Sequence, residues 1–269
     1  MTTRMTVQRL GRLIADGDVE AVRTAVEATP ALLSRTVERG GQGGWTPLHI
    51  AVDEHQADIV RVLVDAGSDV GARTEHGRTP LHVALRFAPE LVPLMLELGA
   101  GIDAPSAAYL DDVDRLTRQL DDGTGPDDRV SGADLLSWAA FGGATSTAKL
   151  LLERGADVDG GALHAAARSG HLDVVRMLLE AGADVDRRDP ETGRAPLHAA
   201  VAAGPTGDAP EIVSVLLGAG ADVNATTNDG ASALDISRVA AARHRSADAG
   251  QATGNDALAD LLVAHGATD

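Results

Sequence analysis

The chain has 269 residues, no cysteine, only 2% aromatic residues and a net charge of −17, with an isoelectric point near 4.8. Without cysteine the chain can form neither a disulfide framework nor a thiolate metal site or nucleophile. A chain this acidic repels phosphate backbones and anionic lipid surfaces, so we expect no nucleic acid and no membrane as partner.

The sequence also indicates where the protein works. No apolar run approaches the roughly 18 residues that a membrane span needs. The first residues lack the apolar core of a signal peptide. We therefore expect a cytoplasmic protein. Lys149 is the single lysine among 23 basic residues, a bias that favours a GC-rich, bacterial coding sequence.

The first part of the chain predicts pairs of short helices. Residues 8–43 hold two amphipathic stretches and then a Gly-rich hairpin loop, as in a degenerate N-terminal cap. Residues 44–76 form a complete helix–turn–helix unit, with His55 where a turn glycine is expected. In residues 77–105 the turn is altered, and Pro93 falls within the predicted second helix, which it should bend.

The middle of the chain is irregular. Residues 106–131 keep an Ala-Ala pair and an acidic helix start, and they end in a polar acidic loop at 121–128. We interpret this loop as solvated, because it lacks the ligand spacing of a calcium loop. Residues 132–160 resume the regular pattern, and Trp138 falls at a buried first-helix position.

The last part of the chain predicts three further units. Residues 161–192 form the most regular one. Residues 193–229 carry an insertion at 205–210 between their two helices. Residues 230–269 should cap the array, with a longer insert at about 240–255 separating the last two helices.

A recurring phrase ties these units together. Thr46-Pro47-Leu48-His49 and Thr79-Pro80-Leu81-His82 lie 33 residues apart, and the pairs Leu163-His164 and Leu197-His198 lie 34 apart. Four units end in Gly, a small residue, Asp and Val, at positions 67, 155, 182 and 220. This period and phrase resemble the ankyrin repeat. The resemblance implies an all-α solenoid of about eight helix–turn–helix units with short hairpin loops, in one domain over residues 1–269.

The resemblance also implies structural roles for the repeated residues. The threonine should cap the first helix, and proline suits its first turn. The histidine should bond the threonine and neighbouring backbone, which ties one repeat to the next. The recurring aspartates Asp69, Asp157, Asp184 and Asp222 should cap or bridge the hairpin loops. Stacking of the units makes the core.

No catalytic, metal or cofactor site emerges from the motifs. The repeated histidines are too far apart along the array to share a metal. The chain has no phosphate-binding loop with a following lysine, and Ser137 has no nucleophile signature. We therefore predict no catalytic residue, no metal and no cofactor.

In ankyrin proteins, partner contacts come from hairpin tips and from the end of the first helix and its turn. Carried over by position, the candidate partner-binding residues are Trp45, Asp53, Glu54, Glu75, His76, Arg78, Arg86, Tyr109, Phe141, Arg168, Ser169 and Arg194. Aromatic and arginine side chains are enriched at binding hot spots. The alternative for Trp45 and Phe141 is that they fill gaps beside the irregular unit.

Three functions stay open on this evidence. The leading one is a non-enzymatic module that binds a partner protein through an acidic concave face, with a basic partner surface favoured by charge. The second is a small-molecule or catalytic pocket near Tyr109, Phe141, Arg86 and Arg168, with Asp53, Glu54 and His55 as acid–base groups. The third is a structural, self-associating solenoid; the sequence sets no oligomeric state.

Overall fold

The computed structural model describes residues 5–204, 208–247 and 255–268. Its internal contacts divide the chain into two units, which we describe separately. Unit 1 comprises Met1–Ser106 with Val130–Gly132, and unit 2 comprises Ala107–Arg129 with Ala133–Asp269. The described residues are mainly helical, as predicted.

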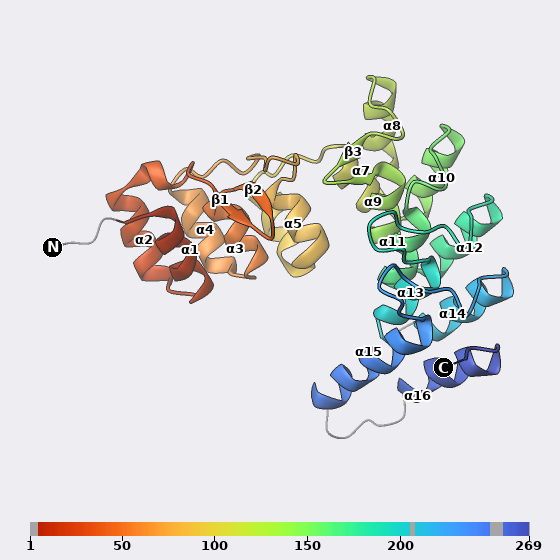
Figure 1. The fold of residues 1–269 in the computed structure, drawn as a ribbon. Helices are drawn as coiled ribbons and strands as arrows, with labels where there is room; N and C mark the ends of the chain where they lie inside the picture. Colours follow the sequence, from red (N-terminus) through yellow and green to blue (C-terminus); the bar gives the residue numbers. More distant parts are fainter. Residues whose placement is uncertain (1–4, 205–207, 248–254, 269) are drawn as a thin grey trace. The chain divides into compact units, whose positions relative to one another are not determined.

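Unit 1 consists of paired helices in two layers (Figure 1). The first helices α1 (Val7–Ala15), α3 (Pro47–Asp53) and α5 (Pro80–Phe87) pack side by side, and α2 (Val19–Ala28) packs on α4 (Ala57–Asp65). The 3-10 turn η1 (Pro30–Leu32) follows α2, and η2 (Pro89–Leu91) precedes α6 (Val92–Glu97). The antiparallel strands β1 (Val37–Arg39) and β2 (Gln42–Trp45) form the predicted hairpin loop.

Unit 2 repeats this arrangement. After α7 (Ala104–Tyr109), which spans the unit boundary, come α8 (Val113–Asp121) and the strands β3 (Arg129–Val130), whose second residue belongs to unit 1, and β4 (Ala133–Asp134). The first helices α9 (Leu135–Gly142), α11 (Ala162–Ser169), α13 (Pro196–Ala202) and α15 (Ala233–Ala247) contact one another in sequence. The second helices α8, α10 (Thr145–Glu153), α12 (Leu172–Glu180), α14 (Ala209–Gly218) and α16 (Asn255–Ala264) form the other layer.

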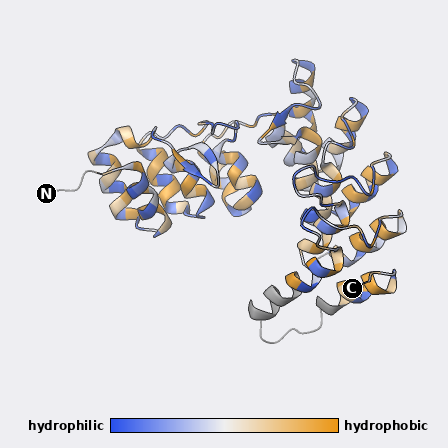
Figure 2. Ribbon diagram, in the orientation of Figure 1, coloured by the Kyte–Doolittle hydropathy of each residue, from blue (hydrophilic) through white to orange (hydrophobic). Residues whose placement is uncertain are grey.

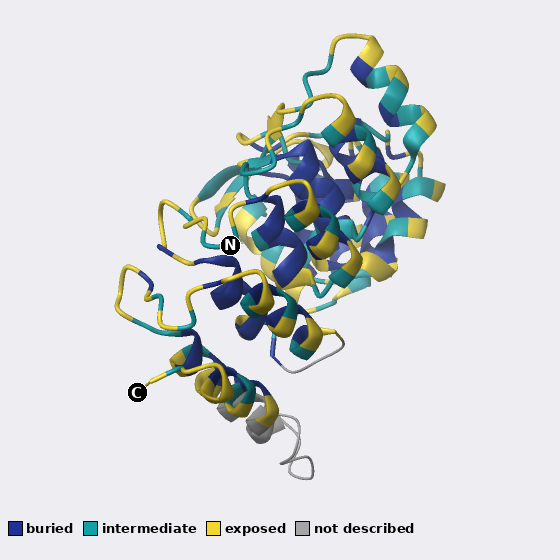
Figure 3. Cartoon of the chain, turned by 90° about the vertical axis from the view of Figure 1, so that its right-hand side faces the viewer, coloured by how far each residue is buried: buried dark blue, intermediate teal, exposed yellow. Residues whose placement is uncertain are grey.

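The core explains why these short helices are stable. Five of the first helices, α3, α5, α9, α11 and α13, bury a leucine and, three residues later, a small alanine, as with Leu48 and Ala51 or Leu163 and Ala166. The alanines have no exposed surface, so neighbouring first helices approach closely. Hydrophobic residues gather on the buried side of each helix (Figures 2 and 3). No single pair could bury this surface alone, so stacking of the pairs makes the core.

Two details of the helices differ from the sequence prediction. The prediction that Pro93 bends a helix is wrong, because η2 takes up the turn and α6 starts only at Val92. Pro93 therefore lies in the first helical turn, where its missing N–H is not needed. The insert predicted at about 240–255 does not separate the last helices from residue 240, because α15 continues to Ala247. Residues 248–254, and residues 205–207 of the other insertion, lie outside the described residues.

Candidate partner-binding surfaces

The repeated histidines bind the next repeat, as predicted. His49 Nε2 donates to the Arg78 carbonyl (3.0 Å), His164 Nε2 to Arg194 (2.9 Å) and His198 Nε2 to Ala225 (3.0 Å). His49 Nδ1 accepts the Thr46 N–H, and Thr46 Oγ1 accepts the His49 N–H. Burial lowers the pKa of His49 to about 4 and also lowers the pKa of His164 and of His198. These imidazoles are therefore neutral near pH 7 and fully used by the fold.

His82 in unit 1 binds a carboxylate instead of a carbonyl. Its Nε2 donates to Asp103 Oδ1 (2.8 Å), which also accepts Ser106 Oγ (2.8 Å), while Asp103 Oδ2 accepts Arg73 Nη2 (3.0 Å). Burial raises the pKa of Asp103, but the hydrogen bonds from these three donors and the charge of His82 hold it well below its usual range. Asp103 thus joins a fully buried imidazole to the surface of unit 1.

Unit 2 links its loops through a series of aspartates. The Asp157 N–H donates to Asp127 Oδ1 (2.8 Å), the Asp184 N–H to Asp159 Oδ1 (2.8 Å) and the Asp222 N–H to Asp186 Oδ1 (3.0 Å). We call the six side chains the carboxylate row: Asp127, Asp157, Asp159, Asp184, Asp186 and Asp222. The prediction that Asp157, Asp184 and Asp222 cap or bridge these loops is confirmed, because each also accepts the N–H two residues on.

Each of these inter-repeat bonds joins the same two loop positions. In these repeats a glycine follows the second helix. The accepting side chain stands four residues after this glycine, as Asp159 does after Gly155. The donating N–H stands two residues after the corresponding glycine of the next repeat, as Asp184 does after Gly182. Asn224 occupies the accepting position in the last repeat, and its Oδ1 accepts the Thr268 N–H (3.0 Å). In unit 1 the same position holds Gly71, which has no acceptor. Sequence reasoning missed Asp127, Asp159 and Asp186, although Asp-Val-Asp recurs at 157–159 and 184–186.

The carboxylate row also contributes charge to unit 2. Within the described part of the chain, none of the salt bridges involves a member of the row. Asp127, Asp157, Asp184 and Asp222 are exposed. Unit 2 therefore presents negative charges at every repeat along its loops.

Two of the three predicted acidic residues of unit 1, Asp53 and Glu54, share one arginine instead. Arg39 Nη2 lies 2.8 Å from Asp53 Oδ2 and 2.5 Å from Glu54 Oε1. Trp45 is buried, with 5% of its surface exposed, and its ring packs against His49 and Arg39 at 5.9 Å. Trp45 thus packs in the core of unit 1, beside residues that do not belong to the irregular unit, and its role in partner binding stays a prediction. Sequence reasoning overlooked Arg39.

A basic aromatic patch lies on the same unit. Phe87 ends α5 and is 42% exposed, and the guanidinium carbons of Arg78 and Arg86 lie 5.6 and 5.7 Å from its ring centroid. Arg78 and Arg86 were predicted from sequence, and the structure brings both of them against the ring of Phe87. Phe87 was missed because it was assigned to the turn. Phe87 stands six residues after Leu81 of the repeated phrase. Glu54 and Ser169, two predicted contact residues, stand six residues after Leu48 and Leu163, so this count would have found Phe87.

The remaining predicted residues are spread over both units. Glu75 and His76 are exposed in unit 1, and Arg168, Ser169 and Arg194 are exposed in unit 2. Tyr109 and Phe141 are half-buried. The Phe141 ring meets buried Trp138 edge-on at 6.4 Å. Gly142 lets α9 approach the Tyr109 backbone, since a Cβ there would come within 2.2 Å of its carbonyl oxygen.

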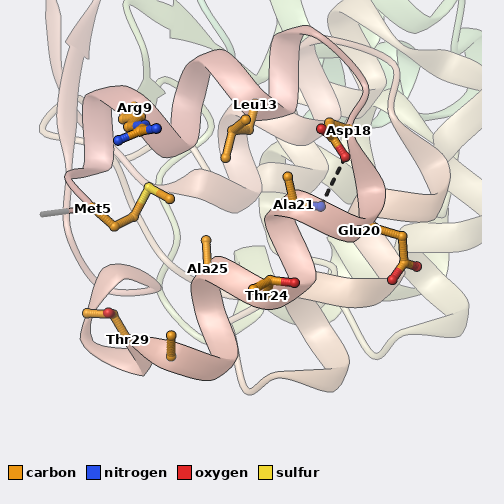
Figure 4. A pocket seen from close by; sticks show the side chains of 10 residues that line it. Met5, Arg9, Leu13, Asp18, Glu20, Ala21, Thr24, Ala25 and Thr29 are labelled. Atoms are coloured by element: carbon orange, nitrogen blue, oxygen red, sulfur yellow. Dashed lines mark hydrogen bonds between the residues drawn. The ribbon is translucent and has the colours of Figure 1, made fainter. Parts of the chain in front are cut away.

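The residues named in the pocket hypothesis are divided between the two units, and the hypothesis stays a prediction. Arg86 belongs to unit 1, whereas Tyr109, Phe141 and Arg168 belong to unit 2. The proposed acid–base groups are ion-paired: Asp53 and Glu54 with Arg39, and His55 Nδ1 with Glu90 at 2.5 Å. An open hollow of about 540 Å³ lies elsewhere, against α1 and α2, and is lined by Arg9, Leu13 and Asp18 among others (Figure 4).

Two structural features bear on other functions. Among the residues that the structure describes, no group of three or more His, Asp or Glu side chains is arranged to hold a metal ion. None of the described helices has the length and apolar character to cross a membrane.

The comparison with family models settles the family. The model for ankyrin repeats (3 copies) matches residues 12–106, 106–189 and 136–227. The chain belongs to the ankyrin-repeat family. The bonds described above are therefore the stacking contacts of an ankyrin array.

Curated ankyrin relatives share parts of this array. Rat protein fem-1 homolog A is 35% identical over 105 residues, which cover 30% of this chain and 16% of the relative. The mouse B-cell lymphoma 3 protein homolog is 31% identical over 234 residues, or 83% of this chain and 41% of the relative. The E3 ubiquitin-protein ligase KEG of Arabidopsis thaliana is 43% identical over 60 residues, 22% of this chain and 4% of the relative. The chain thus spans less than half of these relatives.

The relatives do not test the predicted origin or location. They come from animals and a plant, and the bacterial origin and the cytoplasmic location stay predictions. Ankyrin repeats are typically protein–protein interaction modules, which agrees with the leading function predicted from sequence.

Proposed function

We propose that this chain is a non-enzymatic, cytoplasmic module that binds a partner protein with a basic surface. The ankyrin family supports the protein-binding role. The histidines that sequence alone could suggest as ligands are consumed by stacking, and the carboxylates that could act as acids or bases are paired in unit 1.

The carboxylate row carries the assignment of partner charge. Its members stand without a salt-bridge partner among the described side chains, and they recur at successive repeats of a chain with net charge −17. Opposite potentials on the partner would accelerate encounter and select it over acidic competitors. A basic segment that follows the loops could pair with one repeat after another.

The test neutralises the row without removing its hydrogen bonds. Asn224 already serves as an acceptor in the array, so Asp157→Asn, Asp184→Asn and Asp222→Asn together should keep the fold while removing three charges. The matched control neutralises three exposed carboxylates outside the row: Glu180→Gln, Glu191→Gln and Glu211→Gln. Each protein is used to capture partners from a lysate of the source organism at low and high salt.

We expect a protein partner that is captured by the wild type and the control, is released by salt, and is lost by the Asn variant. Equal capture by the Asn variant would refute the role of the row. Recovery of a small metabolite with no protein would overturn the protein-binding assignment itself.

A further inference from the structure

The hairpin β1–β2 of unit 1 gathers several side chains on one face. Val37 lies opposite Trp45 and Arg39 lies opposite Gln42, so β2 holds one more residue between these pairs than β1 does. Directly opposite residues share a face of an antiparallel pair, and so do residues two apart on one strand. The extra residue of the bulge therefore leaves all four side chains on the same face.

Arg39 reaches from this face to the end of α3. Its Nη2 lies 2.8 Å from Asp53 Oδ2 and 2.5 Å from Glu54 Oε1, and its guanidinium carbon lies 5.9 Å from the centroid of the Trp45 ring. Carboxylates and an aromatic ring are the groups that bind a guanidinium most strongly in proteins. The structure thus shows a guanidinium site that is filled from within the chain.

The contact that Arg39 makes leaves binding capacity unused. Within the described part of the chain, Nη2 is the one nitrogen of Arg39 that meets a carboxylate, whereas a guanidinium can offer a separate nitrogen to each of two oxygens. On the same face of the hairpin, the buried Trp45 Nε1 and Gln42 Oε1 have no hydrogen-bond partner among the described residues. Such groups are costly to bury unpaired. One donor and one acceptor together match the C=O and N–H of a peptide backbone.

The site remains acidic when the charges around it are counted. Burial lowers the pKa of Arg78, and the charge of Asp53 opposes that shift, so Arg78 is a second cation that acts on this carboxylate. Glu75 is a third carboxylate, and it lies against β2. Without Arg39, the three carboxylates Asp53, Glu54 and Glu75 would have Arg78 as their cation. The group that replaces Arg39 therefore has to be positively charged.

Arg39 is exposed enough to be displaced. Its side chain is 37% exposed, and 21% of the Asp53 side chain and 29% of the Glu54 side chain can be reached from solution. Gly40 and Gly41 follow it at the hairpin tip with positive φ angles, and the space beside both is open. Exposed ion pairs contribute about 1 kcal/mol or less. A second guanidinium that brings further contacts can therefore replace Arg39.

We propose that Asp53, Glu54 and the Trp45 ring form a binding site for an arginine side chain of a partner protein, and that Arg39 is its built-in competitor. The inference rests on the proposed binding of a basic partner and adds to it a specific side chain and an internal competitor. An internal contact that is formed about nine-tenths of the time lowers the partner's affinity about tenfold. The site then admits only partners whose other contacts offset this loss.

The two tryptophans of the chain give a direct readout, because Trp45 lies in unit 1 and Trp138 in unit 2. The full chain, labelled with 5-fluorotryptophan, is titrated with the peptide acetyl-Gly-Arg-Gly-amide and followed by ¹⁹F NMR. The control peptides carry lysine or the neutral isostere citrulline in place of arginine. Trp45→Phe assigns the two signals. The titration is made with the wild type, with Arg39→Gln and with Arg39→Lys.

We expect the arginine peptide to shift the Trp45 signal of Arg39→Gln in a saturable way while the Trp138 signal stays in place. The affinity should be about tenfold higher than in the wild type, with Arg39→Lys between them, since lysine is a poorer competitor without the planar fork. The lysine peptide should bind more weakly and the citrulline peptide should leave both signals unchanged.

The carboxylates are tested in the Arg39→Gln background. Adding Asp53→Asn and Glu54→Gln together should abolish the shift. The matched control, Asp58→Asn with Asp65→Asn, neutralises two exposed carboxylates of α4 and should leave the affinity unchanged. Equal binding by both double variants would overturn the assignment of Asp53 and Glu54.

Other outcomes would overturn the inference as a whole. One is an unshifted Trp45 signal in folded Arg39→Gln at tens of millimolar peptide. Another is equal affinity in the wild type and both Arg39 variants, or an equal shift with the citrulline peptide. Unfolding of unit 1 in both variants, seen as a Trp45 signal at its denatured position, would show that Arg39 is a structural contact and not a competitor. None of these outcomes affects the lysate capture by the carboxylate row, so the two proposals fail separately.

Discussion

Units 1 and 2 stack the same repeated phrase with different polar bonds. Unit 1 uses two complete Thr–His capping boxes, at Thr46 and Thr79, and gathers His82, Ser106 and Arg73 around Asp103. Unit 2 keeps the histidines His164 and His198 but adds an aspartate-to-backbone bond at successive loops.

The difference shows that one loop position redirects the polar network of a repeat. In unit 2 this position holds Asp or Asn, and the loop bonds the next loop. In unit 1 it holds Gly71, which has no acceptor, or Asp103, whose carboxylate is taken up by side chains within the unit. The Gly125 N–H, at the donor position, bonds Asp128 within unit 2. Along the chain, the series of loop bonds therefore begins only in unit 2.

The largest effect should come from removing the acceptor at the centre of unit 1. Asp103→Ala leaves the His82 Nε2–H, a fully buried donor, without its carboxylate, which should cost about 3 kcal/mol. The chain has two tryptophans, Trp45 in unit 1 and Trp138 in unit 2. Urea unfolding followed by ¹⁹F NMR of 5-fluorotryptophan should show the Trp45 signal lost earlier and the Trp138 signal little changed. Asp103→Asn, which keeps an acceptor, should cost less; equal costs for the two variants would contradict the role of the acceptor.

Acid should weaken unit 1 through His49. Its folded pKa is about 4 and its unfolded pKa is about 6.5, so the unfolded chain binds the proton more readily. The contribution of His49 to the free energy of unfolding is therefore complete above about pH 6.5 and falls as the pH drops toward 4. At pH 5 unit 1 should have lost about 2 kcal/mol of stability through this group. Asp103 loses its contribution to stability at lower pH than His49. A carboxylate with a depressed pKa stabilises the fold fully above about pH 4 and loses that contribution only as the pH falls further.

This pH dependence is measured from the urea midpoint of the Trp45 signal between pH 7 and pH 5. His49→Gln should be less stable at pH 7, but its urea midpoint should change less between pH 7 and pH 5 than that of the wild type. An unchanged slope in that variant would show that another group titrates in this window.

Breaking one bond of the carboxylate row should have a smaller effect on unit 2. Asp159→Ala removes the acceptor of the Asp184 N–H and should cost about 1 kcal/mol, seen in the Trp138 signal. Asp159→Asn should be nearly neutral, as Asn224 already fills this role. If both variants lost the same stability, the charge and not the hydrogen bond would be responsible.

The smallest effect should come from building the missing bond into unit 1. Gly71→Asn would offer an acceptor to the Gly101 N–H, which no side chain or carbonyl among the described residues accepts. A Cβ at Gly71 would meet only Asp69 Oδ1, at an ordinary 3.5 Å. We expect a gain of about 0.5–1 kcal/mol in the Trp45 transition. Gly71→Ala, which shares the loss of backbone freedom but lacks the acceptor, separates the two contributions.

The sequence was sufficient for the repeat architecture. The 33-residue period, the Thr-Pro-Leu-His phrase and the Gly exits are local signals, because each acts within one helix or one turn. They predicted the helix pairs, the capping histidines, the aspartate-capped loops and buried Trp138. The family models then matched the same repeats.

What the tertiary structure decided lies in contacts between distant residues. The packing of Arg39 on Trp45 and its pairing with Asp53 and Glu54 depend on how side chains from different repeats meet. The grouping of Arg78 and Arg86 over Phe87 lies within one repeat and brings a loop residue onto the end of α5. A motif gives the position of a residue in its own repeat but not the neighbours that stacking brings to it. The physical reason is that a repeat buries its surface only against the next one, so exposure and pairing are properties of the array.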